Sequence, residues 1–535
     1  MRPVLCYQKS VDAISDKALA EQISDPSARL LIARLQTALA LSELKVQALE
    51  ERLRLARIAR YGSRSETLSD LQLSLLDSEP AVSSDEIAAE SERTPLVGAA
   101  DESPVAPVSD NKPKRKHPGR NPLPAHLPRV ETIVSCPPAQ CVCGRCGAET
   151  KVIGYEQTEV LDVKPAEYFV TVLKREKRAC GNCVEQGVQT AVAAQRIAPK
   201  SIFSDAVLID FVMKKYSSSL PLYRQQAELK RDAGLDVPLS TINEGVLRVG
   251  ELLIPVARAI TRELFDSGYI QADETPVGVQ THDKCGRNHT GYFWQYSSPG
   301  KSAVFDFRMG RDREGPRKFL GSFAGILQTD GYAAYVRNVG GPGMIHAGCL
   351  AHARRKYVEA VKVNAQDQDS ARIVEMMDAL FAIDREAREA GMNTEQRHAR
   401  RMANAPQLLD QIHAKLLAMQ RMVLPKSKAG EAVQYTLAQW RRLVLFLDHP
   451  VLELSNNLAE NSMRPIAIGR RNWLHLGSQE AGPKIAAIFS IFESCRRLGI
   501  PVRKYLGDVL PGMPNRSIQN LATITPTAYA ENQAR

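Results

Sequence analysis

Two pairs of closely spaced cysteines carry the clearest chemical signal in the sequence. They are Cys143 and Cys146 in CGRC, and Cys180 and Cys183 in CGNC. The glycine in each pair lets the backbone turn tightly, so that both thiolates face one ion. Four thiolates complete a tetrahedral zinc site, and such a closed site is structural rather than catalytic. We therefore expect one structural Zn²⁺. The alternatives are buried free thiols, or substitution of a ligand by Cys136 or Cys141.

Three acidic residues stand where carboxylates could bind catalytic cations. Asp273 ends the apolar run YIQAD, Asp330 ends GILQTD, and Glu460 lies on an expected helix in LSNNLAENSMRP. Carboxylates at the ends of neighbouring strands can converge, and they repel one another unless cations neutralise them. Oxygen ligands favour Mg²⁺ or Mn²⁺, and two such ions about 3.5–4 Å apart catalyse phosphoryl transfer on phosphodiesters. Each acid taken alone is more typical of a surface or capping carboxylate.

The elements that would position these acids change in kind along the chain. From residue 268 the pattern predicts strands in YIQADETPVGV, GYFWQYSS, AVFDFRM and GILQTDGYAAY, with MIHAGCLAH as a fifth. Residues from about 352 to 448 are expected to be helical. A final helical segment is expected from about Asn457 to Leu498, with a break at Arg464–Pro465.

Residues 201–266 precede the strands and are expected to form three helices, separated by Pro221 and Pro238. Thr241 and Glu244 fit a capping box at the start of the third helix. Three such helices suit either a helix-turn-helix-like DNA reader or a purely structural collar. Residues 130–198 alternate apolar and polar side chains, which predicts a small antiparallel β unit around the cysteines.

The N-terminal part combines a helix, a linker and a basic arm. Residues 28–58 carry an apolar seam with a 3.5-residue period, which predicts a dimerising coiled coil or an amphipathic helix packed on its own protein. Residues 77–110 are rich in acids, Ser, Ala and Pro and read as a disordered linker. Residues 111–129 hold six Lys or Arg and no acid, which suits either a DNA backbone or a solvated linker. The candidate DNA contacts in this arm are Lys114, Arg115, Lys116 and Arg120.

Length and composition bound the possibilities. The chain has 535 residues, enough for three or four domains, and its net charge of +10 is compatible with a polyanionic partner or with a merely basic surface. We find no apolar run long enough for a membrane span and no apolar leader at the N-terminus. The cytoplasm is the default compartment.

Several linked motifs in one order resemble the insertion sequence 66 family of bacterial DDE transposases. The carrying segments are QADETPVGV at 271–279, LQTDGYAAY at 327–335, GCLAHARRKY at 348–357, LSNNLAENSMRPIAIGRRNW at 454–473, and, in the outer parts, ARYGSRSE, KHPGRNPLPAHLPR, the two cysteine pairs, LPLYRQ and YLGDVLPGM. The resemblance covers most of residues 28–513. The family usually places a basic residue directly after the catalytic Glu. This chain has Asn461 there, a departure that would weaken a phosphate contact without removing a metal ligand.

The resemblance implies a multidomain α/β protein with an RNase H-like catalytic core. It also implies a location in the bacterial cytoplasm, in association with the nucleoid. Its DDE acids fall on Asp273, Asp330 and Glu460, which would hold two Mg²⁺ or Mn²⁺ ions. The implied layout is a coiled-coil helix at 25–70, a linker and basic arm at 71–129, a zinc finger at 130–198, a helical DNA-binding region at 199–266, a DDE core at 267–498 with a helical insertion at about 352–448, and a C-terminal tail at 499–535.

Basic residues near these acids are candidates for contacts with DNA phosphates. They are Arg354, Arg355, Lys356, Arg464, Arg470 and Arg471, which an ordinary helix would instead leave solvated. Cys349 and His352 form a C-x-x-H without a second ligand pair, so zinc, local packing and a DNA contact remain open. Trp473 could stack on a base or lie in the core.

The expected activity is metal-dependent DNA cleavage and strand transfer at the inverted ends of an insertion sequence. The expected partners are double-stranded DNA, a second copy or more of the chain, and small accessory proteins of the same element, which are implied by the resemblance alone. Two alternatives remain: a non-catalytic zinc-finger DNA-binding protein or inactive transposase relic, and an RNase H-like nuclease without joining activity. An intact acidic triad favours the enzyme over a relic.

Overall fold

The computed structural model describes residues 167–179, 188–281, 287–335 and 339–534, together with Arg145 and a series of positions between Ser27 and Leu53. The chain divides into two compact units, residues 1–94 with 175–535 and residues 95–174. The four candidate zinc cysteines, the linker and the basic arm with Lys114, Arg115, Lys116 and Arg120 lie outside the described residues.

Helical positions occupy the described part of the predicted N-terminal seam. The apolar residues there are more than half exposed, namely Leu30, Leu31, Leu35, Leu39, Val46, Leu49 and Leu53. An apolar helical stripe of this kind is stable when another helix covers it. The dimerising coiled coil therefore stays a prediction that this exposure favours.

A six-stranded mixed sheet forms the centre of the larger unit. β3 (Tyr269–Val279) pairs antiparallel with β4 (His289–Ser297), which pairs antiparallel with β5 (Ala303–Arg308). On its other side β3 pairs in parallel with β6 (Ile326–Gln328), which pairs in parallel with β7 (Ile345–Ala347). The order is β5-β4-β3-β6-β7, and β8 (His475–Leu476) adds to the far end of β3. All five strands predicted from the sequence are present, and β8 was missed.

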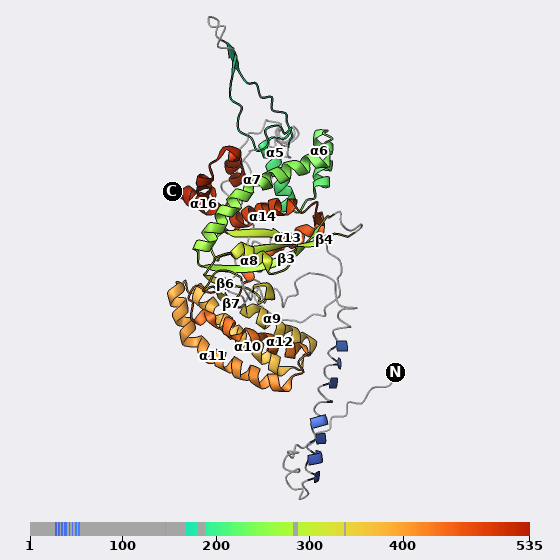
Figure 1. Cartoon of the computed structure of the whole chain (residues 1–535), viewed down its shortest axis with the longest axis vertical. Coiled ribbons are helices and arrows are strands. Elements are labelled where there is room, and N and C mark those ends of the chain that lie inside the picture. The colour runs from blue at the N-terminus through green and yellow to red at the C-terminus, as the bar shows by residue number, and fades with distance from the viewer. Residues whose placement is uncertain are drawn as a thin grey trace, which may run out of the picture. The chain divides into compact units, whose positions relative to one another are not determined.

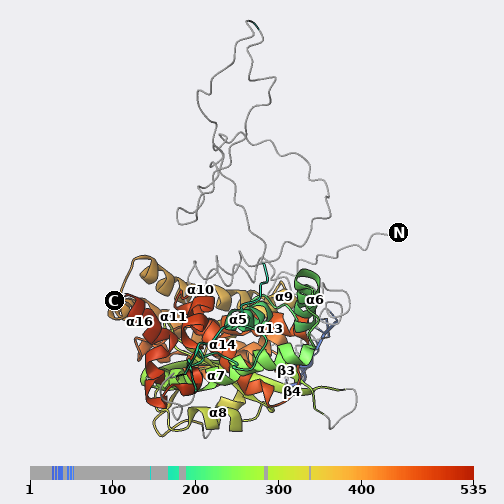
Figure 2. The ribbon, with the colours of Figure 1, turned by 90° about the horizontal axis from the view of Figure 1, so that it is seen from above.

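Three helices pack against the sheet, namely α7 (Leu239–Asp266), α13 (Asn457–Trp473) and α14 (Ala481–Arg497). Two shorter helices, α5 (Asp205–Tyr216) and α6 (Leu222–Ala233), pack against α7. Figure 1 shows α7 and α14 on one side of β3 and β4, and Figure 2 shows the same helices from above. At Gly250 of α7 a Cβ would lie 2.6 Å from the Lys484 carbonyl oxygen of α14, so the two helices approach closely because no side chain intervenes.

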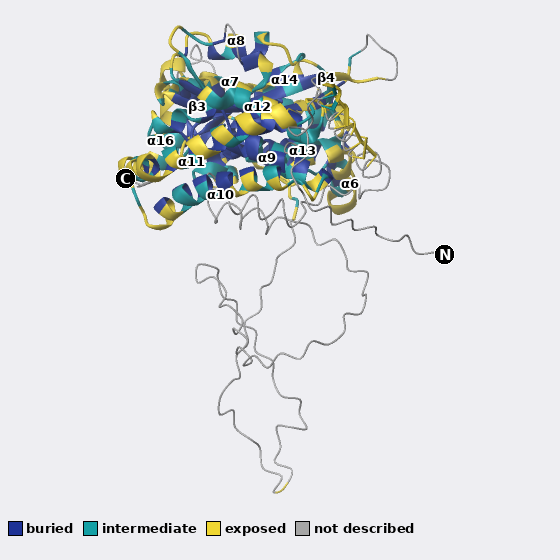
Figure 3. Cartoon of the chain, turned by 90° about the horizontal axis from the view of Figure 1, so that it is seen from below, coloured by how far each residue is buried: buried dark blue, intermediate teal, exposed yellow. Residues whose placement is uncertain are grey.

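A block of four helices follows β7, and in Figure 1 it lies beyond β6 and β7. It contains α9 (Leu350–Val363), α10 (Gln368–Glu389), α11 (Thr394–Met422) and α12 (Lys428–Leu443). Buried and exposed positions alternate along these helices, as Figure 3 shows. Inside the block Arg401 donates two hydrogen bonds of 2.6 Å to Asp384, and both side chains are 1% exposed. The paired charges neutralise each other, so they can stay buried.

Two expectations about the helices need correction. α7 begins at Leu239 after Pro238, without a side-chain cap, so Thr241 lies inside the helix and the capping box is absent. Pro465 does not break α13, which continues to Trp473. The break comes at Leu474, whose φ is +64°. The segment named as the C-terminal tail, residues 499–535, contains α15 (Val502–Val509), two 3₁₀ segments and α16 (Pro526–Ala534).

Two smaller elements complete the described part. β1 (Lys177–Ala179) and β2 (Val188–Thr190) form an antiparallel pair within the predicted β unit. α8 (Glu314–Leu320) follows β5, and a 3₁₀ turn (Ala333–Tyr335) follows β6. No described helix combines the length and apolar composition that a membrane crossing needs.

Candidate active site

The register of two parallel strands brings the first two acids to the same end of the sheet. Gln271 of β3 is paired with Gln328 of β6, and each glutamine stands two residues before an acid, Asp273 or Asp330. Because side chains alternate along a strand, residues at matching positions of parallel neighbours lie on the same face. The sequences QAD and QTD therefore deliver two carboxylates to the same end of the sheet.

The pKa of Asp273 shows that the other acids lie close to it. Burial raises the pKa of Asp273 well above its usual value, and the negative charges of Glu460, Glu274 and Asp330 raise it further. A charged carboxylate is disfavoured among like charges in a partly buried site. Three distant parts of the chain thus converge closely enough to repel one another.

Asp330 stands in a turn that its neighbours hold firmly. Its Oδ1 accepts a hydrogen bond of 2.8 Å from the Tyr332 backbone N–H, and its carbonyl oxygen accepts one of 2.5 Å from the Tyr435 hydroxyl of α12. Gly331 has a φ of +87°, which an L-residue adopts at a cost. A Cβ there would also meet the Gln439 side chain at 2.9 Å. The turn consequently needs glycine directly after the acid.

Glu460 lies in the first turn of α13 and faces α9. His352 Nε2 lies 3.1 Å from Glu460 Oε1, and the Arg355 guanidinium donates a hydrogen bond of 3.2 Å to Oε2. Burial lowers the pKa of His352, and the negative charge of Glu460 opposes that effect. Cys349 is fully buried, and its Sγ lies 3.5 Å from the Asn456 backbone N–H. The C-x-x-H motif thus packs around the segment that carries Glu460.

A buried ion cluster fixes α13 against α14. Glu493 of α14 accepts hydrogen bonds from Ser462 (2.6 Å), Arg496 and Arg497, and Arg497 also donates to the Leu458 carbonyl. Burial alone would raise the pKa of Glu493, but the charges of Arg497 and Arg496 and their hydrogen bonds lower it to about 2. Ser462 lies two residues beyond Glu460, so this cluster anchors the helix turn that carries the acid.

A second buried network ties the return of the chain to the strand ends. The Tyr269 hydroxyl donates to Gln328 Oε1 (2.6 Å), and Gln271 Nε2 donates to Gln328 Oε1 (3.0 Å) and to the Ser455 carbonyl (2.9 Å). Gln328 Nε2 donates to the Glu453 carbonyl at 2.7 Å, and the Glu453 N–H donates to Tyr269 at 3.2 Å. These contacts hold the residues just before α13. Sequence reasoning missed this network, although the repeated Gln-x-Asp was visible.

Glu274, the residue after Asp273 in β3, is a fourth acid close to the three candidate acids. Its carboxylate accepts hydrogen bonds from Arg311 (2.6 and 3.0 Å) and from the Tyr335 hydroxyl (3.1 Å), and its side chain is 3% exposed. Tyr332 in turn donates to the Arg311 carbonyl at 2.8 Å. These bonds link β3 to the turn that contains Asp330. Sequence reasoning also missed this residue.

The donor set fits a divalent cation in its chemistry. Carboxylate oxygens are the ligands that Mg²⁺ and Mn²⁺ prefer, and the mutual repulsion seen at Asp273 is what a cation relieves. In the described part of the chain, however, no group of three or more His, Cys, Asp or Glu side chains is arranged so that it could hold a metal ion. Glu460 instead contacts His352 and Arg355.

The candidate DNA-contacting residues near the acids have different environments. Arg354 is 8% exposed and pairs with Asp378, and its contact with DNA stays a prediction. Lys356 lies over the Tyr435 ring at 4.7 Å, and Arg470 donates to Thr275 and to the Pro276 carbonyl. Arg464 is half-buried and Arg471 is exposed on α13. Together with Arg355, four of these side chains surround the acids or continue along α13.

Comparison with known proteins identifies relatives across the whole chain. A profile of the Transposase IS66 family matches residues 200–484, which include Asp273, Asp330 and Glu460. A profile described as zinc-finger binding domain of transposase IS66 matches residues 140–184, which include all four candidate zinc cysteines. A third profile, described as Transposase C of IS166 homeodomain, matches residues 48–132.

Three uncharacterized proteins of Sinorhizobium fredii are similar over most of their length. Protein y4hP is 29% identical over 520 residues, which cover 92% of this chain and 89% of the relative. Protein y4jD is 30% identical over 428 residues, covering 77% and 82%, and y4qI is 28% identical over 552 residues, covering 97% of both. The similarity therefore includes the outer parts of the chain as well as the sheet.

Proposed function

Because the chain belongs to the IS66 family of transposases, we propose that Asp273, Asp330 and Glu460 are the acids that bind its catalytic metal ions. The chain is a transposase, an enzyme that cleaves and transfers DNA, and its family membership implies divalent metal use. The convergence of the three acids, expressed in the raised pKa of Asp273, carries this assignment. The ions we propose are two Mg²⁺ or Mn²⁺ per active site.

The fold we propose for the core is RNase H-like. An order of β5-β4-β3-β6-β7, with only β4 antiparallel to its neighbours, supports this proposal. So does the placement of the first acid on the central strand β3 and of the second just after β6. The helices α9 to α12 would then be an insertion between the second and third acids.

In this assignment Asp273, Asp330 and Glu460 would hold the ions through their carboxylate oxygens. Bound ions would activate water and a DNA 3′-hydroxyl and stabilise the leaving oxygen of the phosphodiester. Arg355 and His352 hold the Glu460 carboxylate, and they would give up these contacts if Glu460 acted as a metal ligand. Arg355, Lys356, Arg464, Arg470 and Arg471 would then face DNA phosphates.

The remaining parts would bind DNA and join subunits. The residues that we propose as ligands of one structural Zn²⁺ are Cys143, Cys146, Cys180 and Cys183, and the zinc-finger profile over residues 140–184 supports them. The basic arm and the helices α5 to α7 would hold the element's ends, and the exposed apolar stripe between Ser27 and Leu53 would pair with a second copy. Accessory proteins of the same element remain a proposal from the family alone.

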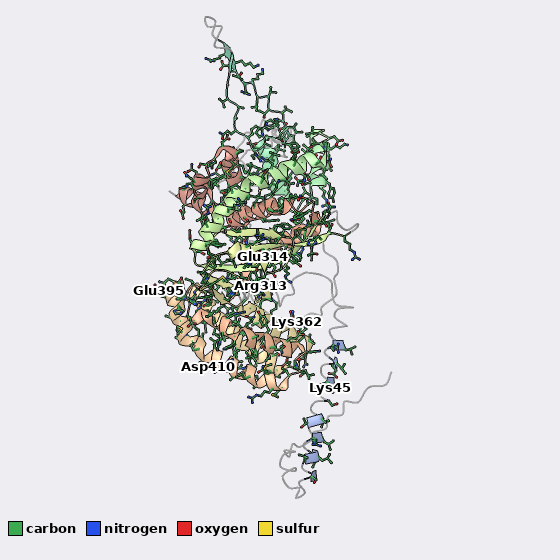
Figure 4. The ribbon with its side chains drawn as sticks, viewed as in Figure 1. Lys45, Arg313, Glu314, Lys362, Glu395 and Asp410 are labelled. Carbon is green, nitrogen blue, oxygen red and sulfur yellow. The ribbon has the colours of Figure 1, made fainter. Side chains whose placement is uncertain are left out.

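The test is cleavage and joining of DNA that carries the element's ends, with Mg²⁺ or Mn²⁺. The variants Asp273→Asn, Asp330→Asn and Glu460→Gln should each lose more than about 100-fold in cleavage rate, the upper end of the loss for groups behind a metal ligand. The control is Asp410→Asn, an exposed acid on α11 that Figure 4 labels, and it should cleave at the wild-type rate. A wild-type rate for Asp273→Asn would overturn the assignment. Strand-transfer products distinguish a transposase reaction from simple nuclease cleavage.

A further inference from the structure

A cavity of about 270 Å³ lies away from the three acids, between α5, α7, β8 and the start of α14. Of these elements, α5, α7 and α14 lie side by side in Figures 1 and 2. The polar residues that line it include Lys215, Tyr216, Asn243, His475 and Ser478. None of the described residues that line the cavity is an acid. The lining therefore offers hydrogen-bond donors and one cation without a balancing carboxylate.

Lys215 is the charged group of this cavity. Burial lowers the pKa of Lys215 to about 8, and no ion pair or hydrogen bond joins it to another described residue. Its ammonium lies 5.3 Å from the centroid of the Tyr216 ring. The preceding residue, Lys214, instead pairs with Asp210 at 3.2 Å and with Glu228 at 3.0 Å. A buried ammonium without a counter-charge is unfavourable, and a bound anion would remove that penalty.

Tyr216 gives a second, independent sign of a missing partner. Its side chain is 3% exposed, and its hydroxyl has no hydrogen-bond partner among the described residues. Buried hydroxyl groups normally have a partner, because an unsatisfied one costs about 1–3 kcal/mol. A ligand oxygen in the cavity would supply that partner. Tyr216 also packs edge-on against Phe489 at 5.3 Å, so its ring is fixed in place.

The first residues of α14 add a favourable field. Ala481 and Ile485 line the cavity, and α14 begins without a side-chain cap. The N-terminus of a helix attracts negative charge. Glu480, which accepts a hydrogen bond from Ser478, is exposed and is not among the lining residues. Gly477 at the rim is exposed, and an added Cβ there would meet nothing within 4 Å, so the entrance has room.

We propose that this cavity binds a phosphate group of the DNA substrate through Lys215, Tyr216 and the start of α14. His475 of β8 lies at the cavity and is paired with Gly278 of β3, five positions beyond Asp273. At about 3.3 Å per strand residue this is roughly 17 Å from the acid, or about five base pairs along a duplex. That the bound phosphate belongs to DNA rests on the proposed function, whereas the binding of an anion in this cavity does not.

The experiment measures DNA binding by the full chain without divalent metal, so it is independent of cleavage. Lys215→Met removes the charge, Lys215→Arg retains it, and Lys214→Met is the matched control on the same helix. Each phosphate contact contributes about 0.9 to the slope of log affinity against log salt concentration. Lys215→Met should lower that slope by about 0.9, so that the wild-type advantage in affinity shrinks about 3.5-fold between 50 and 200 mM salt. Lys215→Arg should restore the slope, and Lys214→Met should leave it unchanged.

A second arm uses inorganic phosphate and thermal unfolding. Phosphate should raise the Tm of the wild type but not of Lys215→Met, because only the former binds it. Lys215→Met itself should not lower the Tm, since it removes an unpaired buried charge, and this outcome also shows that the variant folds. A phosphate-dependent Tm without a change in the DNA slope would assign the cavity to a free anion and overturn the DNA part. If neither the slope nor the phosphate response changes, the cavity is not an anion site. Loss of cleavage in Asp273→Asn with normal binding would leave this inference untouched.

Discussion

Replacement of Glu493 by glutamine tests how the third acid is held in place. Glu493 is 4% exposed at its side chain, and Arg497, its main partner, is 3% exposed. Glutamine keeps the shape and can still accept a hydrogen bond from Ser462, but it leaves the guanidinium groups of Arg496 and Arg497 without a negative partner. Removing one member of a buried pair is costly because the other charge stays buried.

The size of the effect follows from the pKa. A decrease in the pKa of Glu493 from 4.5 to about 2 corresponds to about 3 kcal/mol of folding free energy. Because the folded-state pKa is lower than the unfolded one, this contribution is fully present above pH 4.5. It decreases as the pH falls toward 2. The wild type should therefore exceed Glu493→Gln by about 3 kcal/mol at pH 6 and by about 2 kcal/mol at pH 3.5.

Guanidinium unfolding at the two pH values measures this difference. The control is Asp410→Asn, the exposed acid on α11, whose replacement should leave the free energy of unfolding unchanged. A difference in the free energy of unfolding below about 1 kcal/mol at pH 6 would refute the reasoning, since breaking a buried ion pair is expected to cost more than that. A difference that is no smaller at pH 3.5 than at pH 6 would also refute it.

Three further predictions concern the other contacts around the site. Tyr435→Phe removes the hydroxyl that holds the Asp330 carbonyl. It should lower the cleavage rate about tenfold, as loss of a group behind a metal ligand does, and a wild-type rate would contradict the positioning role. Tyr269→Phe leaves the Glu453 N–H without its acceptor and should reduce the free energy of unfolding by about 2 kcal/mol in a guanidinium titration. An unchanged midpoint would show that the network is not needed. Cys143→Ser should lose bound zinc in a metal-content measurement, and one retained zinc per chain would exclude this cysteine as a ligand.

The strands were predictable because their chemistry is local. Runs such as YIQAD and GILQTD combine apolar and β-branched residues, and the structure has β3 and β6 at these positions. The helix ends were harder to predict. Pro465 suggested a break because proline lacks an N–H, yet burial of Ile466 and Gly469 keeps α13 continuous. Packing outweighed local preference there, and it also stabilises the C-terminal helices through buried Tyr505 and Leu506.

The candidate acids themselves could not be selected from spacing. They came from a resemblance, since many acids in the sequence end an apolar run or begin a helix. The residues that position these acids could not be predicted from the sequence, because Glu493, Tyr435 and Glu274 act through contacts between segments far apart in the chain. Only Gln271 and Gln328 left a local sign, because the same Gln-x-Asp spacing occurs on two strands that turn out to be paired in register.

The helical block between the second and third acids explains why so many buried polar contacts surround the site. A chain that leaves the sheet after β7 and returns before α13 must place Glu460 accurately after four helices. Apolar packing alone tolerates small shifts, whereas hydrogen bonds are directional and fail when their partners move. Glu453 makes such hydrogen bonds to both the sheet and the helical block. Its backbone bonds with Tyr269 and Gln328, and its carboxylate pairs with Arg397 of α11. The block therefore helps to position the third acid, and its helices α9 and α12 also contact Glu460 and Asp330 directly.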